Sequence, residues 1–111
     1  MKWKIVYSEN ALKDLKAIYR YIALELCAPK AAEGQVERIL SGVRLLSEMP
    51  DRHPVYDLEP MKLKEIRSFP INNYVIFYRL KKEIKTVSII RIIYGGRDIE
   101  KQIPDSGGNP D

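Results

Sequence analysis

The chain is built around the segment Asn73-Tyr-Val-Ile-Phe-Tyr-Arg-Leu-Lys-Lys-Glu-Ile-Lys-Thr-Val-Ser-Ile-Ile-Arg-Ile-Ile-Tyr-Gly-Gly-Arg-Asp98. Two apolar runs in it, Tyr74 to Leu80 and Thr86 to Tyr94, are rich in β-branched and aromatic residues and flank a charged connector. Such residues favour strands, so the segment predicts a β-hairpin. Because both runs are almost continuously hydrophobic, we expect central strands that are covered on at least one face.

Each predicted strand of the hairpin carries one arginine, Arg79 or Arg91. If both face away from the helices, they form a basic strip with Arg67 that would hold phosphate or an acidic protein segment. If they face the helices, their burial requires paired carboxylates, and Asp14 and Glu48 are the candidates. We favour the open-face arrangement.

The N-terminal half predicts a strand followed by two helices. Trp3 to Tyr7 is a short strand, and Ser8 is the N-cap of an amphipathic helix of about five turns. Ala28-Pro29 ends this helix, and Pro29 opens a second one that runs to about Met49. Helices joined by so short a turn form a hairpin. Their apolar stripes comprise Leu12, Leu15, Ile18, Tyr19, Ile22, Leu26, Val36, Ile39, Leu40, Val43 and Leu46.

The region between the helices and the β-hairpin begins with a proline-rich loop, Pro50 to Pro60, with a brief extended piece at Val55-Tyr56. Leu63 to Phe69 then predicts a second strand, which Pro70 ends. Ile71-Asn72-Asn73 supplies the turn into the hairpin.

This order predicts an α+β fold of two layers: an N-terminal strand, a helical hairpin, then an antiparallel sheet of three further strands. We expect a single domain over residues 1–103, with one helical turn from Ile99 to Ile103. Residues 104–111 have no apolar anchor and predict a disordered tail.

Bulk composition excludes several classes of protein. A chain of 111 residues with 45% hydrophobic and 31% charged residues is typical of a globular domain, and its net charge of +4 leans mildly towards acidic partners. One cysteine, Cys27, permits no intramolecular disulfide and no cysteine-rich metal site, and we expect it to be buried. We expect no cofactor. We expect neither a signal peptide nor a transmembrane helix at the N-terminus, and therefore a cytoplasmic protein without membrane contact.

Local residues and element order together resemble the RelE/ParE superfamily of type II toxin–antitoxin toxins over about residues 3 to 103. The matching positions are Val6-Tyr7-Ser8, Ala11, Asp14-Leu15, Ile18, Tyr21-Ile22, Ile66-Arg67, Tyr74-Val-Ile-Phe-Tyr-Arg79 and Ile90-Arg-Ile-Ile-Tyr-Gly-Gly-Arg-Asp98.

The resemblance implies an antitoxin partner, bound in a toxin–antitoxin hetero-oligomer, and one of two targets. RelE-like members are ribosome-dependent endoribonucleases that cut mRNA, whereas ParE-like members inhibit DNA gyrase and lack the nuclease residues. A degenerate toxin that only binds its antitoxin is a third alternative.

The resemblance also implies candidate catalytic residues, which are Arg67, Tyr94 and Arg97. RNA cleavage needs a proton acceptor, cations for the phosphorane and a donor for the leaving oxygen. Two positions depart from the nuclease pattern: Glu65 replaces one of its lysines, and Ile103 stands near its late tyrosine. We therefore place the chain nearer to the ParE branch and leave open whether it is an enzyme.

Candidate target- or antitoxin-binding residues are the cations of the same region. They are Lys62, Lys64, Arg67, Arg79, Arg91 and Arg97. His53, the only histidine, lies in the proline-rich loop, where a solvated side chain is expected rather than a catalytic base.

Overall fold

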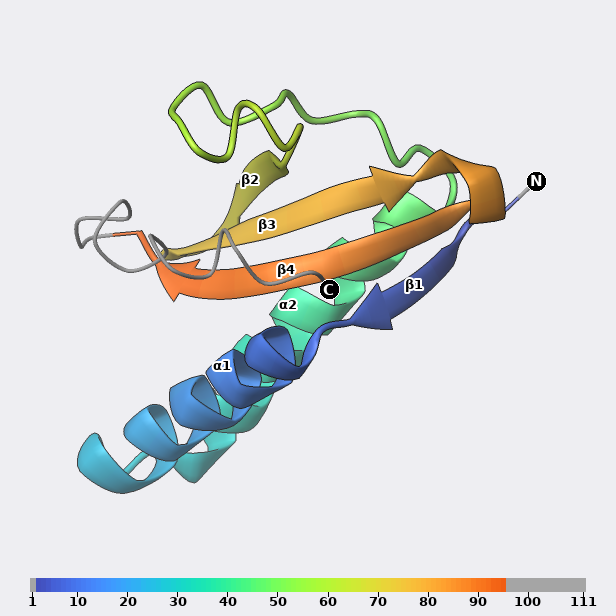
Figure 1. Cartoon of the computed structure of the whole chain (residues 1–111). Coiled ribbons are helices and arrows are strands. Elements are labelled where there is room, and N and C mark those ends of the chain that lie inside the picture. The colour runs from blue at the N-terminus through green and yellow to red at the C-terminus, as the bar shows by residue number, and fades with distance from the viewer. Residues whose placement is uncertain (1, 96–111) are drawn as a thin grey trace.

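The structure is a computed structural model that describes residues 2–95. The predictions for Arg97, for the helical turn at residues 99–103 and for the tail at 104–111 lie outside this range. The elements in order are β1 (Lys4–Tyr7), α1 (Glu9–Arg20), a π-helical turn (Tyr21–Glu25), α2 (Pro29–Arg44), a 3-10 turn (Leu45–Ser47), β2 (Arg67–Ile71), β3 (Tyr74–Lys81), a 3-10 turn (Lys82–Ile84) and β4 (Thr86–Tyr94) (Figure 1).

The four strands form one sheet in the order β1-β4-β3-β2. The predicted antiparallel arrangement of the last three strands is confirmed. β1 joins the sheet parallel to β4, with Lys4 opposite Thr86 and Tyr7 opposite Ile89, so the sheet as a whole is mixed. The intervening helices provide the long crossover that a parallel connection requires.

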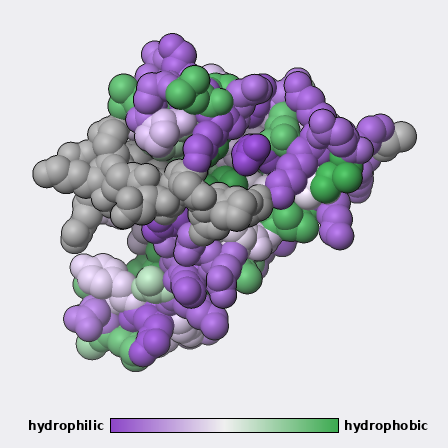
Figure 2. Space-filling model, in the orientation of Figure 1, coloured by the Kyte–Doolittle hydropathy of each residue, from purple (hydrophilic) through white to green (hydrophobic). Residues whose placement is uncertain are grey.

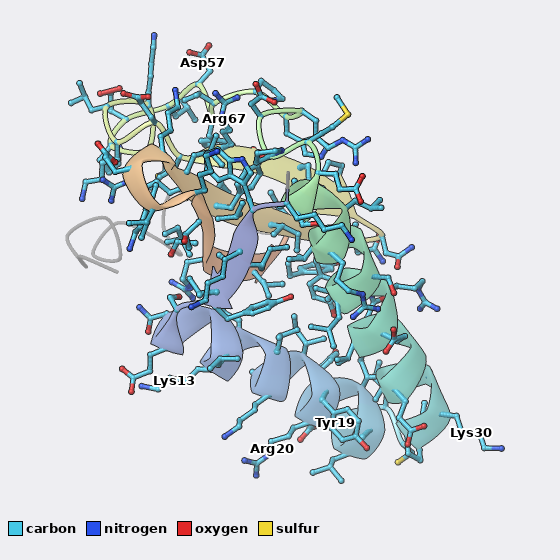
Figure 3. All side chains as sticks on the ribbon, turned by 90° about the vertical axis from the view of Figure 1, so that its right-hand side faces the viewer. Lys13, Tyr19, Arg20, Lys30, Asp57 and Arg67 are labelled. Carbon is cyan, nitrogen blue, oxygen red and sulfur yellow. The ribbon has the colours of Figure 1, made fainter. Side chains whose placement is uncertain are left out.

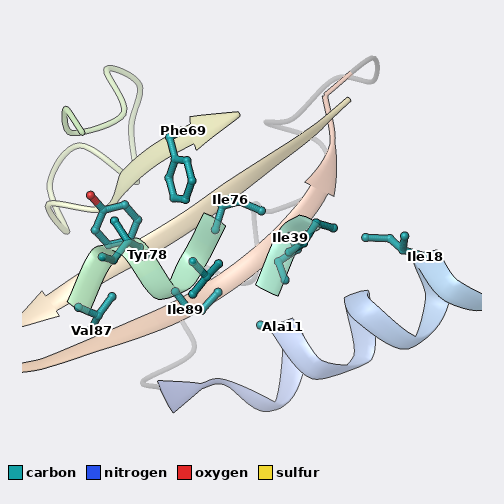
Figure 4. Packing of buried hydrophobic residues seen from close by; sticks show 11 residues of the cluster. Ala11, Ile18, Ile39, Phe69, Ile76, Tyr78, Val87 and Ile89 are labelled. Atoms are coloured by element: carbon teal, nitrogen blue, oxygen red, sulfur yellow. The ribbon is translucent and has the colours of Figure 1, made fainter. Parts of the chain in front are cut away.

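Both helices cover the same face of the sheet, which confirms the two-layer prediction (Figure 1). Ser8 caps α1 as predicted, because its Oγ accepts a hydrogen bond of 3.0 Å from the amide of Ala11. Side chains from both layers meet in one apolar cluster (Figure 4). Its buried members are Ala11, Ile18, Ile39, Val43, Leu46, Phe69, Ile76, Tyr78, Val87, Ile89 and Ile92.

A second, smaller apolar cluster lies on the opposite face of the sheet, under the chain that leads to β2. Met61 and Ile66 of that chain pack with Phe77, Ile90 and Ile93 of the sheet. Alternate residues of a strand point to opposite faces, so Phe77 belongs to this cluster and its neighbours on β3 to the first. Both sheet faces are therefore partly covered, which goes beyond the predicted cover on at least one face.

The second strand differs from its prediction at both ends. β2 begins at Arg67 instead of Leu63 and continues through Pro70 to Ile71. β2 is the edge strand, where a proline can lie without removing a ladder hydrogen bond. Leu63 belongs to a turn and is 81% exposed, so the lysines on either side of it do not lie on a strand.

The tip of the helical hairpin also differs from its prediction. The first helix ends in a π-helical turn, and Leu26 is 56% exposed instead of continuing the apolar stripe. Cys27 is exposed, which contradicts its predicted burial, and adopts a left-handed φ of 53°. The hairpin extends past the sheet here (Figure 1), so nothing from the sheet can bury these residues.

Candidate functional site

Arg91 lies against α1 and not in a basic strip. Its Nε donates to Oδ2 of Asp14 at 2.8 Å, and its second donor, Nη2, lies 3.1 Å from Oδ1. Both side chains are largely buried, at 18% and 16% exposure. The favoured open-face arrangement is therefore wrong for Arg91, and the alternative with Asp14 holds. The other candidate carboxylate, Glu48, lies at the surface 3.7 Å from Lys2.

The sheet geometry explains this pairing. Between β3 and β4 the register shifts at Phe77/Tyr78, so that Ile90, directly before Arg91, is a bulged residue of β4. The pairing of β1 with β4 ends at Ile89, so the next part of β4 has no strand beside it. Asp14 of α1 occupies that edge, where its Oδ2 accepts a hydrogen bond of 2.9 Å from the amide of Ile92.

A groove of about 480 Å³, which we call the tyrosine groove, runs beside this ion pair. It is lined by Asp14, Ala17, Ile18, Tyr21, Tyr74, Arg91, Ile92, Ile93 and Tyr94. Tyr74 and Tyr94 make an edge-to-face contact with centroids 5.9 Å apart. Burial raises the pKa of Tyr74, and the neighbouring Tyr94 and Tyr21 raise it further, so its hydroxyl stays protonated at neutral pH. The groove thus combines apolar walls with hydrogen-bonding groups, as ligand and peptide sites do.

Tyr94 and Arg67, two of the candidate catalytic residues, lie at different places on the molecule. Tyr94 is 47% exposed at the tyrosine groove. The guanidinium of Arg67 donates to the carbonyl of His53 at 2.6 Å and to that of Asp51 at 3.5 Å. It therefore anchors the proline-rich loop to β2. The third candidate, Arg97, is outside the described residues.

His53 is packed rather than solvated. Its ring stacks on Phe69 with centroids 4.1 Å apart, and Tyr78 contacts it edge-on. Burial lowers the pKa of His53, and the charge of Arg52 lowers it further, so the imidazole is neutral at neutral pH. The prediction of a solvated histidine is wrong because the carbonyl bonds of Arg67 hold this loop against β2.

Three of the candidate cations, Lys64, Arg67 and Arg79, line a second cavity of about 120 Å³, which we call the basic pocket. It is lined by Lys64, Glu65, Arg67, Arg79, Leu80 and Lys82. Lys62 lies apart and forms an exposed ion pair of 3.4 Å with Asp57. At the opposite end of the molecule, Lys13, Arg20 and Lys30 project from the helices (Figure 3).

Residues 2–95 contain neither a metal-binding cluster nor a helix that could cross a membrane. Within this range, no group of three or more His, Cys, Asp or Glu side chains is placed to hold a metal ion. The helices here lack the length and apolar character needed to span a bilayer. Hydrophilic side chains dominate the face in Figure 2, with apolar residues in separate patches.

The family model for the ParE toxin of the type II toxin–antitoxin system parDE matches residues 5–99. This chain belongs to the ParE toxin family. No curated protein matches its sequence at a significant level.

Solved structures from toxin–antitoxin systems share the fold of this chain. A chain of the chromosomal ParDE system from P. aeruginosa is 21% identical, with a TM-score of 0.67, over 84% of this chain and 96% of that one. One from the RelBE2 toxin–antitoxin complex of Mycobacterium tuberculosis is 20% identical, with a TM-score of 0.58, over 85% and 99%. A mutant of E. coli toxin RelE in the free state reaches 0.67 at 11% identity, over the whole of both chains.

Two features of this ParE family member were missed by sequence reasoning. The tyrosine groove brings Ala17 and Tyr21 of the helical hairpin beside Tyr94 of β4. Lys82 joins the basic pocket. Helical spacing of Asp14, Ala17 and Tyr21 was the available signal for the groove, since residues three and four apart share a helix face.

Proposed function

We propose that this chain inhibits DNA gyrase by protein contact and is neutralised by a cognate antitoxin. The observation that carries the proposal is the match to the ParE toxin family over residues 5–99. The P. aeruginosa structure comes from a ParDE system, and at 21% identity it supports the fold only.

The placement of the candidate catalytic groups supports binding over catalysis. RNA cleavage requires an acid, a base and cations around one phosphate. Arg67 is committed to loop carbonyls, and Arg91 to Asp14. Tyr94 lines the tyrosine groove, which shares no residue with the basic pocket. Among the described residues, these groups do not converge on one reacting centre.

The tyrosine groove is the surface that we assign to the antitoxin. An amphipathic segment can place apolar side chains against Ile18 and Ile93, while Tyr21, Tyr74 and Tyr94 offer polar tips at the rim. This mode of recognition uses a long apolar groove rather than a reacting centre.

A paired assay tests the target. Purified chain is added to a gyrase supercoiling reaction, and mRNA 5′ ends are mapped after its expression in a sensitive host. We expect loss of supercoiling with intact messages. Codon-phased mRNA cuts with normal supercoiling would instead identify a ribosome-dependent ribonuclease. The absence of both effects would indicate a chain that only binds its antitoxin.

The assignment of the groove has its own test. Ala17 is exposed in the groove, so Ala17→Glu should place a charge there without disturbing the core. We expect it to prevent co-purification with the product of the neighbouring reading frame. Lys13→Glu, on an exposed part of the same helix outside the groove, is the control. Equal binding by both variants would reject the groove.

A further inference from the structure

We propose that the basic pocket binds a carboxylate from an acidic segment of a protein partner. This surface shares no lining residue with the tyrosine groove, so the inference does not depend on which target the toxin acts on.

Strand register creates the basic pocket. β2 begins with Arg67 opposite Tyr78, so the next residues of β3, Arg79 and Leu80, extend beyond it. A tight turn fills the corner, in which the amide of Lys64 bonds to the carbonyl of Pro60 at 3.3 Å. The 3-10 turn after β3 adds Lys82 from the other side.

Among residues 2–95, Lys64 and Arg79 of the basic pocket are not paired with an acidic side chain. Lys64 and Arg79 are each half-buried. Within residues 2–95, neither makes an ion pair or a side-chain hydrogen bond, and Glu65 is not paired with them either. Partly desolvated charges without partners raise the free energy of the protein, and a bound oxyanion would lower it. Because the lining has four basic residues and one acidic residue, the ligand should carry a negative charge.

The size and lining of the pocket favour a carboxylate on a peptide over nucleic acid. A cavity of about 120 Å³ suits one small anionic group. Single-stranded nucleic acid is held by long basic grooves with aromatic side chains for base stacking, whereas this lining has no aromatic residue. Within two residues of the lining in sequence lie Leu63 and Ile84, which are 81% and 66% exposed and offer apolar contacts to the flanks of a peptide.

NMR titration of the full chain tests the proposal. The probes are a Leu-Glu-Glu-Leu peptide with blocked termini, its Leu-Gln-Gln-Leu counterpart and a short thymidine oligonucleotide. We expect the acidic peptide to bind at least about tenfold more tightly than the amide peptide, because each charge-assisted hydrogen bond lost costs about this factor. Its shifts should centre on Arg79.

Matched variants separate a specific site from general attraction. The double variant Lys64→Gln/Arg79→Gln should weaken binding of the acidic peptide about tenfold or more. The control Lys13→Gln/Lys30→Gln makes the same charge change on the helices (Figure 3) and should weaken binding about twofold at most. Neither pair removes an ion pair within residues 2–95, so circular dichroism should show folded protein. Equal weakening by both pairs, equal binding of the two peptides, or tighter binding of the oligonucleotide would each overturn the proposal.

Discussion

Asp14 makes two contacts at the edge of the sheet. Its carboxylate pairs with Arg91 and also accepts the amide of Ile92 at 2.9 Å. Beyond β1, the edge of β4 is thus bonded by Ser8 at the carbonyl of Ile90 and by Asp14 at the amide of Ile92. The second contact ties α1 to the strand that carries Tyr94.

Removing this carboxylate should be costly. Asp14→Ala removes the carboxylate that pairs with a largely buried guanidinium and that accepts a hydrogen bond from the amide of Ile92, so we expect the free energy of unfolding to fall by about 3 kcal/mol. Asp14→Asn keeps an acceptor for the amide and should cost less. Urea denaturation measures both variants. Equal losses would mean that the amide bond is unimportant.

His53 should make stability depend on pH. Because burial and Arg52 lower its pKa in the folded protein, its contribution is present above pH 6.5, the ordinary value, and is lost as pH falls through the lowered one. We expect the melting temperature to fall less between pH 7 and pH 5 in His53→Phe, which keeps a ring on Phe69. Arg52→Gln should show an intermediate slope. An unchanged slope in His53→Phe would contradict this assignment.

At the scale of the element, α2 contains two glycines with different surroundings. A Cβ at Gly34 would meet only the Nη1 of Arg38 at 3.4 Å, whereas one at Gly42 would lie 2.5 Å from Cδ1 of Ile71. Of the two glycines, Gly42 is therefore the one at which α2 closely approaches β2. Gly34 has no such contact and only lowers the helix propensity of α2.

Alanine substitutions should separate these roles. Gly34→Ala should stabilise the protein by about 0.5–1 kcal/mol through helix propensity. Gly42→Ala should destabilise it by about 1 kcal/mol, because Ile71 must move. Ile71→Val removes the clashing Cδ1 and should recover part of that loss in the double variant. Thermal denaturation checks the set, and stabilisation by Gly42→Ala alone would show that the contact yields freely.

At the scale of the whole molecule, the sheet is covered on both faces by different parts of the chain. The helices cover one face, and the chain before β2 covers the other through Met61, which is 2% exposed. That second cover also positions the turn of the basic pocket. Its packing should therefore influence both stability and the surface that we assign to an acidic partner.

Met61→Ala should lower the free energy of unfolding by about 2–5 kcal/mol, because it opens a cavity under this segment. Hydrogen exchange should rise first at the amides of Tyr56 and Ile66, which bond across the segment. Leu63→Ala, an exposed neighbour, should change neither measurement. Uniform exchange across the sheet would instead indicate that the segment opens only with the whole domain.

Local sequence was enough to predict the order of elements, the hairpin from Tyr74 to Tyr94, the cap at Ser8 and the helix start at Pro29. Each depends on propensity, alternation or a backbone constraint within a few neighbouring residues. The placement of the cations required the folded chain. Arg91 was placed by its contact with Asp14, a residue 77 positions earlier in the chain that only the fold brings beside it. Lys64, Arg79 and Lys82 likewise meet because β2 starts at Arg67, a boundary set by tertiary pairing with β3.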